Sequence, residues 1–262
     1  MVEDYLIDTH SHLYSEEFLP DLAEVVDRAR IEGIKRIYLP AIDSKTANSM
    51  FQLEKDYPDL CIAMIGLHPC YVKANFREEL QFVKKCLETR KFAAVGEIGL
   101  DYHWDRSFDA AQKESFSYQV DLALHYDLPI VIHSRDSMED TIALVGSKQN
   151  GSLRGIFHCF SGTYEQAVQI IDLGFLLGIG GVLTYKKSGL AEIVGRLPME
   201  SMVLETDAPY LTPVPFRGKR NESAYLKHIA VKLAEIKNLS LGEVSRITSA
   251  NAERLFKYNR GE

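Results

Sequence analysis

Six residues whose side chains bind divalent metals stand where apolar, strand-like runs of the sequence end. They are His10 and His12 in YLIDTHSH, Glu97 in AAVGEIG, His133 in PIVIHS, His158 in GIFHCF and Asp207 in MVLETDAP. Imidazole and carboxylate groups are the ligands that hold catalytic divalent metals in proteins. One such histidine taken alone is more often structural, but the whole set indicates an active site assembled from several strand ends.

The spacing within two of these runs also suits a metal site. Side chains alternate across a strand, so His10 and His12 emerge on the same side, with Asp8 beside them. Glu205 and Asp207 share a side in the same way. We assign Asp207 as the metal ligand and Glu205 as a residue that orients a ligand from behind. Three further histidines fall in helical segments or in a loop and receive no role: His103, His125 and His228.

The elements that would position these residues alternate between strands and helices. Short β-branched or apolar runs predict eight strands, at residues 5–9, 35–41, 61–66, 93–98, 129–133, 155–160, 175–180 and 202–206. Eight parallel strands separated by helices are what a closed barrel needs, and an open doubly wound sheet is the alternative. We therefore predict an α/β fold, a TIM (β/α)8 barrel.

The segments between the strand-like runs have helical spacing, as Phe116 and Val120 illustrate. Near the end of the chain, Ser240 and Glu243 form a capping-box pattern and predict an extra C-terminal helix. This helix is expected to close the outside of the barrel. No low-complexity linker interrupts the pattern, so residues 1–262 are expected to form a single domain.

Composition limits the classes of protein that fit this chain. With 262 residues, 46% hydrophobic and 26% charged, it can bury a large core without disulfides. The four cysteines lack a CxxC pair and the N-terminus lacks the features of a secretion signal, so a cytoplasmic location is expected. No apolar run approaches the roughly 20 residues of a membrane span. The formal charge of −7 argues against a broad basic surface, so any nucleic acid must bind a local patch or through metals.

Six ordered motifs resemble those of the TatD-type metal-dependent deoxyribonucleases. They are HSH at residues 10–12, GLHP at 66–69, GEIGLDY at 96–102, IHSRD at 132–136, HCFSG at 158–162 and ETDAPYL at 205–211. The resemblance extends from Asp8 to near the C-terminus. It implies a TIM barrel of the amidohydrolase-like metal hydrolases. The glutamate at the end of the fourth strand, in place of a carboxylated lysine, favours this branch over the dihydroorotase-like and phosphotriesterase-like ones.

The resemblance also implies two divalent metal ions per chain. One would be held by His10, His12 and Asp207, a second by His133 and His158, with Glu97 bridging them. The four imidazoles suit zinc, manganese or cobalt better than magnesium. Members of the family are nevertheless often magnesium-dependent, so the identity of the metal stays open.

The reaction that the resemblance implies is hydrolysis of phosphodiester bonds by two-metal activation of water. Asp207 is expected to help deprotonate the attacking water, and Glu97 to act with it at the metals. We expect a 3′-5′ exonuclease on single-stranded DNA, and on RNA as a further substrate, in DNA repair or degradation. The alternative is a D-aminoacyl-tRNA deacylase or another ester or amide hydrolase. A scaffold protein is disfavoured because no ligand is missing, and no obligate protein partner is evident.

Contacts to the substrate are expected from residues outside the ligand set. His68 in GLHP would donate a hydrogen bond to a phosphate oxygen, with helix capping or packing as its alternative role. Arg135 would reach the same mouth and bind phosphate, unless it pairs with Asp136. Asp101 and Tyr102 would line the pocket, although packing explains Tyr102 equally well.

A basic loop after the last strand is a further candidate for contact with the substrate. It has the sequence FRGKR, at residues 216–220. Arg217 would hold a backbone phosphate and Phe216 would stack on a base. A charge run of this length is just as often a solvated loop.

Overall fold

The computed structural model describes residues 4–257 and contains eight strands in the order that the sequence predicts. They are β1 (Leu6–Asp8), β2 (Ile34–Pro40), β3 (Cys61–Met64), β4 (Val95–Asp101), β5 (Ile130–Arg135), β6 (Gly155–Phe157), β7 (Leu176–Ile179) and β8 (Met202–Leu204). Each of the eight predicted segments overlaps one of these strands.

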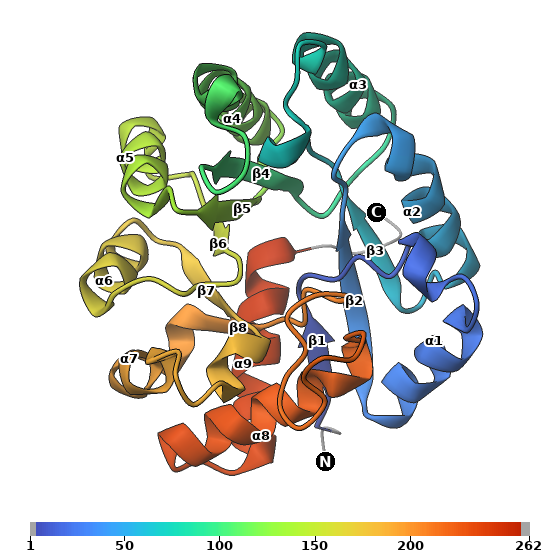
Figure 1. Ribbon diagram of the computed structural model, residues 1–262, viewed down its shortest axis with the longest axis vertical. Coiled ribbons are helices and arrows are strands. Elements are labelled where there is room, and N and C mark those ends of the chain that lie inside the picture. The colour runs from blue at the N-terminus through green and yellow to red at the C-terminus, as the bar shows by residue number, and fades with distance from the viewer. Residues whose placement is uncertain (1–3, 258–262) are drawn as a thin grey trace.

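Helices follow the strands along the chain. In the described part they are α1 (Leu22–Ile31), α2 (Ser44–Asp56), α3 (Phe76–Thr89), α4 (Asp109–His125), α5 (Met138–Lys148), α6 (Tyr164–Asp172), α7 (Leu190–Arg196), α8 (Leu226–Lys237) and α9 (Leu241–Phe256). Figure 1 shows α1 to α8 around the strands in chain order, with α9 inside this ring. Within residues 4–257, no helix has both the length and the apolar character needed to cross a bilayer.

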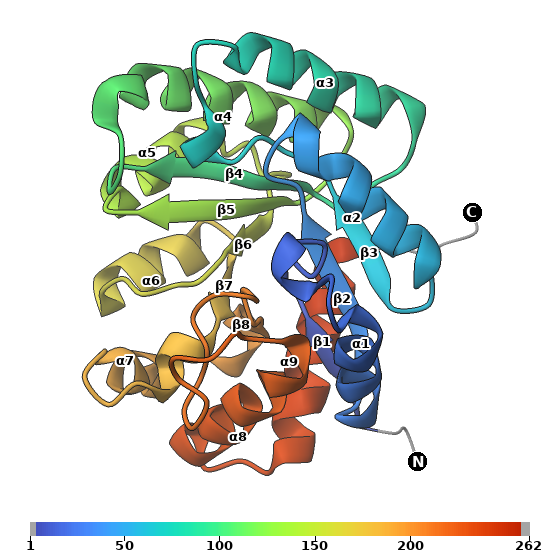
Figure 2. The ribbon, with the colours of Figure 1, turned by 45° about the vertical axis from the view of Figure 1, so that its right-hand side comes forward.

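The parallel strands form a closed ring. Strands β1 to β3 and β4 to β8 pair in sequence order, and β4 and β5 run side by side in Figure 2. One junction is bridged at Ile65 and Val95, and the other at Ser11 and Ala208. The Asp207 N–H also donates to the His10 carbonyl at 2.9 Å, which ties the end of β8 to the end of β1. The predicted TIM barrel is confirmed, and the open doubly wound sheet is excluded.

Alternate residues of the strands meet inside the barrel. This interior cluster contains Ile7, Tyr38, Ile62, Met64, Val131, Ile156 and Val203. Neighbours of opposite parity, such as Ile37 and Ile132, pack instead with the surrounding helices. Because Val131 and Ile156 face inward, His133 and His158, two residues further along, point into the barrel at its C-terminal end. We call this end, where the strands finish, the mouth.

The last helix lies across the opposite end of the barrel. The capping box at Ser240 and Glu243 is present as predicted. The expectation that α9 covers the outside was wrong, because Phe256 enters the interior cluster and stacks on Tyr38 with ring centroids 3.9 Å apart. The side chain of Asn251 donates to the carbonyls of Met199 and Met202, where β8 begins. An amphipathic pattern shows that a helix has an apolar face, but not which surface that face covers.

This packing predicts that truncating Phe256 destabilises the fold. Phe256 is 4% exposed, and Phe256→Ala removes its ring from the barrel interior, which typically costs about 3 kcal/mol or more in the free energy of unfolding. Urea unfolding followed by circular dichroism measures this loss. The control is Ile31→Ala, at a side chain that is 80% exposed, where we expect a change within about 0.5 kcal/mol. Equal midpoints for Phe256→Ala and wild type would contradict the assigned role of α9.

Candidate metal centre

The mouth of the barrel brings together all six side chains that the sequence singles out. His10 and His12 follow β1, Glu97 lies in β4, His133 in β5, His158 follows β6 and Asp207 follows β8. Glu97 is 2% exposed and stands at the centre of the group. Residues separated by up to 197 positions in the chain therefore share one buried site because the barrel gathers its strand ends.

The two carboxylate oxygens of Glu97 face two different groups of histidines. Its Oε2 lies 3.1 Å from His10 Nε2 and 3.5 Å from His12 Nε2. Its Oε1 lies 2.9 Å from His133 Nδ1 and 3.0 Å from His158 Nε2. One carboxylate thus stands between two sets of ligand atoms, in a position suited to bridge two cations.

Asp207 completes the group on the Oε2 side. Its Oδ1 lies 3.7 Å from His10 Nε2 and 3.6 Å from His12 Nε2. The two Nε2 atoms of His10 and His12 are themselves only 3.3 Å apart. At most one proton can lie between two facing ring nitrogens, whereas a metal ion accepts both lone pairs. The donor atoms therefore fit a divalent cation at this point.

A bulge in β4 aims the central carboxylate. Gly96 pairs with Val131 and Ile98 pairs with Ile132, so Glu97 is an extra residue in the ladder with β5. Such a bulge redirects a side chain relative to the regular alternation of a strand. A Cβ added at Gly96 would lie 2.8 Å from the Cβ of Val131, so only glycine fits beside the bulge.

Hydrogen bonds behind His12 fix which of its nitrogens faces the cluster. The Tyr14 hydroxyl donates its single proton to the Pro40 carbonyl at 2.6 Å. Its oxygen, 2.9 Å from His12 Nδ1, is therefore left to accept. The proton of neutral His12 sits on Nδ1, and Nε2 presents a lone pair to the site. Tyr14 was not predicted from the sequence, although its spacing from His12 repeats the spacing of the HSH motif.

His68 has the opposite arrangement of its ring nitrogens. Its Nδ1 accepts a hydrogen bond from the Cys70 N–H at 3.0 Å, so neutral His68 carries its proton on Nε2. That Nε2 lies 3.3 Å from Glu97 Oε1, at the edge of the cluster. His68 thus caps the 3-10 turn at Pro69–Tyr71, the alternative role that the sequence allowed. Its Nε2 is left to donate, and its contact with a phosphate stays a prediction, although its ring could also reach a metal with Glu97 and His133.

Two further carboxylates support the histidines on the Oε1 side. Asp101 Oδ2 lies 2.8 Å from His133 Nε2, which turns His133 Nδ1 toward Glu97. Asp101 is 2% exposed, so we reassign it from lining the pocket to orienting His133. Glu205 lies behind His158, with its Oε1 3.3 Å from His158 Nδ1, where the sequence placed a supporting residue.

Gly178 in β7 leaves the space that the Glu205 side chain fills. A Cβ at this position would lie 2.2 Å from Glu205 Oε2.

Asp8, by contrast, does not join the cluster. It accepts hydrogen bonds from the N–H of Thr206 at 2.9 Å and from its hydroxyl at 2.6 Å. The strand β1 ends at Asp8, so the alternation of side chains between the two faces stops there. Asp8 and His10, two residues apart, therefore point in different directions.

Burial and charge perturb the ionisation of the cluster strongly. Burial opposes the ionisation of Glu97, but the imidazoles around it hold its pKa well below the usual range. Burial raises the pKa of Asp207 to about 6, against the effect of the nearby histidines. Burial would lower the pKa of His158, yet the carboxylates of Glu97 and Glu205 raise it well above the usual value. Protonated imidazole thus compensates the buried carboxylates here, and a divalent metal bound at the same atoms would take the place of those protons.

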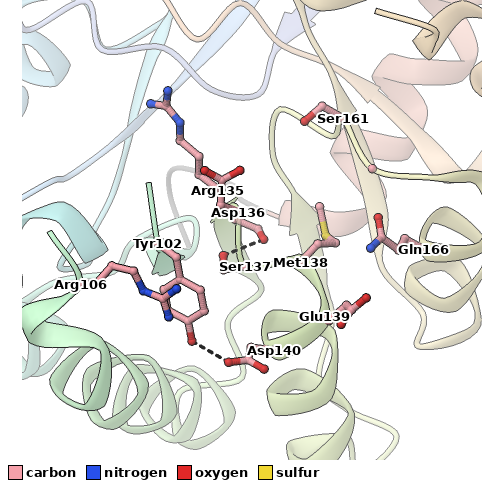
Figure 3. A pocket seen from close by; sticks show the side chains of 12 residues that line it. Tyr102, Arg106, Arg135, Asp136, Ser137, Met138, Glu139, Asp140, Ser161 and Gln166 are labelled. Atoms are coloured by element: carbon pink, nitrogen blue, oxygen red, sulfur yellow. Dashed lines mark hydrogen bonds between the residues drawn. The ribbon is translucent and has the colours of Figure 1, made fainter. Parts of the chain in front are cut away.

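A polar pocket of about 730 Å³ opens next to the end of β5. Its walls include Tyr102, Arg106, Arg135, Asp140, Ser161 and Gln166 (Figure 3). The Tyr102 hydroxyl donates to Asp140 at 2.7 Å. Asp136 lies 2.9 Å from His103 Nδ1, and Arg135 stacks over the ring of Trp104 with 5.2 Å between its Cζ and the ring centroid. The anticipated pair of Arg135 with Asp136 is not formed.

The basic loop at residues 216–220 is largely engaged in packing. The ring of Phe216 stacks on Tyr225 with centroids 4.3 Å apart, so this face is not open to a base as expected. Arg220 pairs with Asp21 at 2.7 Å. Arg217 is exposed and stacks over Tyr185, and its contact with a phosphate stays a prediction.

Comparison with known proteins gives the same assignment as the fold and the cluster. Residues 7–257 match the family described as TatD related DNase. The chain is 40% identical to the uncharacterized metal-dependent hydrolase YabD of Bacillus subtilis, over 97% of this chain and 100% of YabD. It is 29% identical to the 3′-5′ ssDNA/RNA exonuclease TatD of Erwinia tasmaniensis, over 96% of this chain and 99% of the exonuclease.

A solved structure shows the same architecture. The crystal structure of YjjV, a TatD homologue from Escherichia coli K12, superposes with a TM-score of 0.91 at 30% identity, covering 97% of this chain and 98% of YjjV. Family, fold and the His, Glu and Asp groups able to hold metal at the mouth agree with one another. The protein belongs to the TatD-related DNase family and is a TIM-barrel, metal-dependent hydrolase.

Proposed function

We propose that this protein is a two-metal nuclease that hydrolyses single-stranded DNA, and RNA as a further substrate, from the 3′ end. The arrangement of Glu97 carries the proposal, because its two oxygens face separate sets of ligand atoms. The similarity to a relative named as a 3′-5′ ssDNA/RNA exonuclease supports the choice of substrate and direction. All four cysteines are free, which supports the expected cytoplasmic location.

In this proposal the six clustered side chains divide into two ligand sets around one bridge. The sets are His10, His12 and Asp207 on the Oε2 side of Glu97, and His133 and His158 on its Oε1 side. Bound there, two divalent ions such as zinc, manganese, cobalt or magnesium would acidify water and neutralise the charge of a phosphodiester. The chain's own contribution is to hold the donor atoms in place and to keep the central carboxylate dry.

Residues at the edge of the cluster would move the proton and hold the substrate. The Asp207 side chain is 13% exposed, against 2% for Glu97, so it can reach a water molecule at the mouth. We assign Asp207 as the group that accepts a proton from the attacking water. His68, with its proton on Nε2, would donate a hydrogen bond to a phosphate oxygen.

The first experiment is digestion of single-stranded DNA labelled at its 3′ or 5′ end by protein reconstituted with zinc, manganese, cobalt or magnesium. We expect chelator-sensitive products in which the 3′ label is lost first. Glu97→Gln removes the bridging charge and should lower kcat by more than about 100-fold, beyond the effect usual for a supporting residue. The matched control is Glu88→Gln, at a side chain that is 51% exposed.

Three outcomes would contradict the proposal. Full cleavage in the presence of chelator would exclude metal catalysis. Equal cutting of circular and linear strands would exclude the exonuclease. Turnover of a D-aminoacyl-tRNA that leaves the nucleic acid intact, with no cleavage of DNA or RNA, would replace the nuclease by a deacylase.

The tautomer assigned to His12 gives a separate prediction. Tyr14→Phe removes the acceptor of the His12 Nδ1 proton and should weaken metal binding by about 10- to 100-fold, as measured by calorimetric titration of metal-free protein with zinc. The control is Tyr5→Phe, which also loses a partly buried hydrogen bond of a tyrosine hydroxyl, to Glu253 at 2.7 Å. Tyr5 lies at the end of the barrel opposite the cluster. Equal loss of zinc affinity in both variants would show that the hydroxyl of Tyr14 has no specific role.

A further inference from the structure

Exposed aromatic side chains gather at the mouth of the barrel. In the described part of the chain, the aromatic residues among the large exposed hydrophobic side chains are Tyr71, Trp104 and Tyr210, which are 42%, 69% and 56% exposed. They follow β3, β4 and β8, and so all lie at the end that holds the histidine cluster. Single exposed apolar side chains are common, so what distinguishes these rings is how each is held and what surrounds it.

Trp104 is held in place rather than left loose. The ring of His103 contacts it edge-on, with centroids 4.9 Å apart, and His103 is itself fixed by Asp136 at 2.9 Å. The guanidinium of Arg135 lies over the Trp104 ring, 5.2 Å from its centroid. With 69% of its surface still exposed, the indole presents an open, anchored aromatic face.

Arg135 keeps its charge available for this arrangement. Asp136 contacts His103 at 2.9 Å, and within residues 4–257 no carboxylate lies within ion-pair distance of Arg135. In Figure 3 the Arg135 side chain points away from the hydrogen bond between Tyr102 and Asp140. A guanidinium stacked on an indole, and free of a carboxylate, is suited to a ligand that has both a flat ring and negative charge.

The stacked pair is linked to the proposed catalytic cluster by short paths. Arg135 follows His133 by two residues of β5, a span of about 7 Å in a strand. On the other side, Trp104 follows closely after Asp101, whose carboxylate orients His133. A nucleotide next to a phosphodiester at the cluster would therefore reach Trp104 with its base.

The pocket beside the pair fits a base better than a second phosphate. Its lining includes the carboxylates of Asp136 and Glu139, which repel a phosphate group, whereas the charge of the third carboxylate, Asp140, is compensated by Lys113 at 2.6 Å. The charge of Arg106 is engaged by Asp109 at 2.6 Å, outside this lining. Hydroxyl and amide groups of Ser161 and Gln166 supply neutral donors and acceptors for the edge of a base or for a sugar.

We propose that Trp104, backed by Arg135, is a stacking site for one unpaired nucleobase of the nucleic-acid strand whose backbone enters the metal centre. The proposal rests on the proposed nuclease function and names how the substrate is recognised. Stacking on an aromatic ring tolerates every base, since each has a flat π face. It also selects single strands, because the bases of a duplex are already stacked on each other.

The chain offers a direct readout, because Trp104 is its single tryptophan. We would titrate metal-reconstituted wild type with a phosphorothioate oligothymidylate, which resists hydrolysis, and follow the tryptophan fluorescence. A matched phosphorothioate strand without bases carries the same backbone charge. We expect saturable quenching by the oligothymidylate and none by the abasic strand. Equal quenching by both strands, or by neither, would overturn the stacking site.

Kinetics on cleavable oligothymidylate supply the second arm. Trp104→Ala should raise KM about 10-fold, the scale of one lost base–aromatic stack, with a smaller effect on kcat. Trp104→Phe keeps a ring and should restore most of the affinity. The control, Ile31→Ala, removes an exposed apolar side chain at the opposite end and should leave KM unchanged.

The two arms separate this inference from the proposed function. Quenching by bases without cleavage of any strand would refute the nuclease and leave the stacking site standing. A normal KM for cleavage by Trp104→Ala, together with wild-type fluorescence that the oligothymidylate does not quench, would refute the stacking site and leave the nuclease standing.

Discussion

The buried carboxylate of Glu97 is the constraint on which the rest of the mouth depends. A charge that is 2% exposed is tolerated only when partners surround it, and here imidazoles approach both of its oxygens within 3.5 Å. A hydrogen-bond acceptor behind an imidazole fixes its tautomer. Tyr14 and Asp101 perform this task for His12 and His133. The charge of Glu97 therefore explains why polar side chains lie behind the histidines that contact it.

The barrel satisfies this constraint by placing apolar side chains in its middle and polar ligands at its mouth. Inward-facing residues are apolar through the middle of the barrel and become ligands as each strand ends, as Val131 and His133 illustrate. The N-terminal end is sealed by α9, with Phe256 inserted among the interior side chains. The mouth is thus free to carry buried charge and exposed rings, while stability comes from the opposite end and from the packing of the helices.

Much of this arrangement could be predicted because it follows from local patterns. A strand run that ends in His or Glu places its ligand by periodicity, and the barrel brings such ends together. Contacts set by tertiary packing could not be predicted in this way. Parity failed at Asp8, where regular alternation stops, and the π face of Phe216 was already covered by Tyr225. The sequence allowed His68 either to cap a helix or to contact phosphate, and only the fold shows that its Nδ1 accepts from the Cys70 N–H as a cap.

Charge and aromatic surface together explain how an acidic protein could hold an acidic polymer. With a formal charge of −7, a broad basic surface cannot supply the affinity. The charges of Arg106 and Arg220 are compensated by ion pairs with Asp109 and Asp21. Attraction must then come from cations at the metal centre and from uncharged stacking on rings such as that of Trp104. In the proposed function, such a mouth would recognise a strand through one phosphate and one base at a time, as suits an enzyme that works from an end.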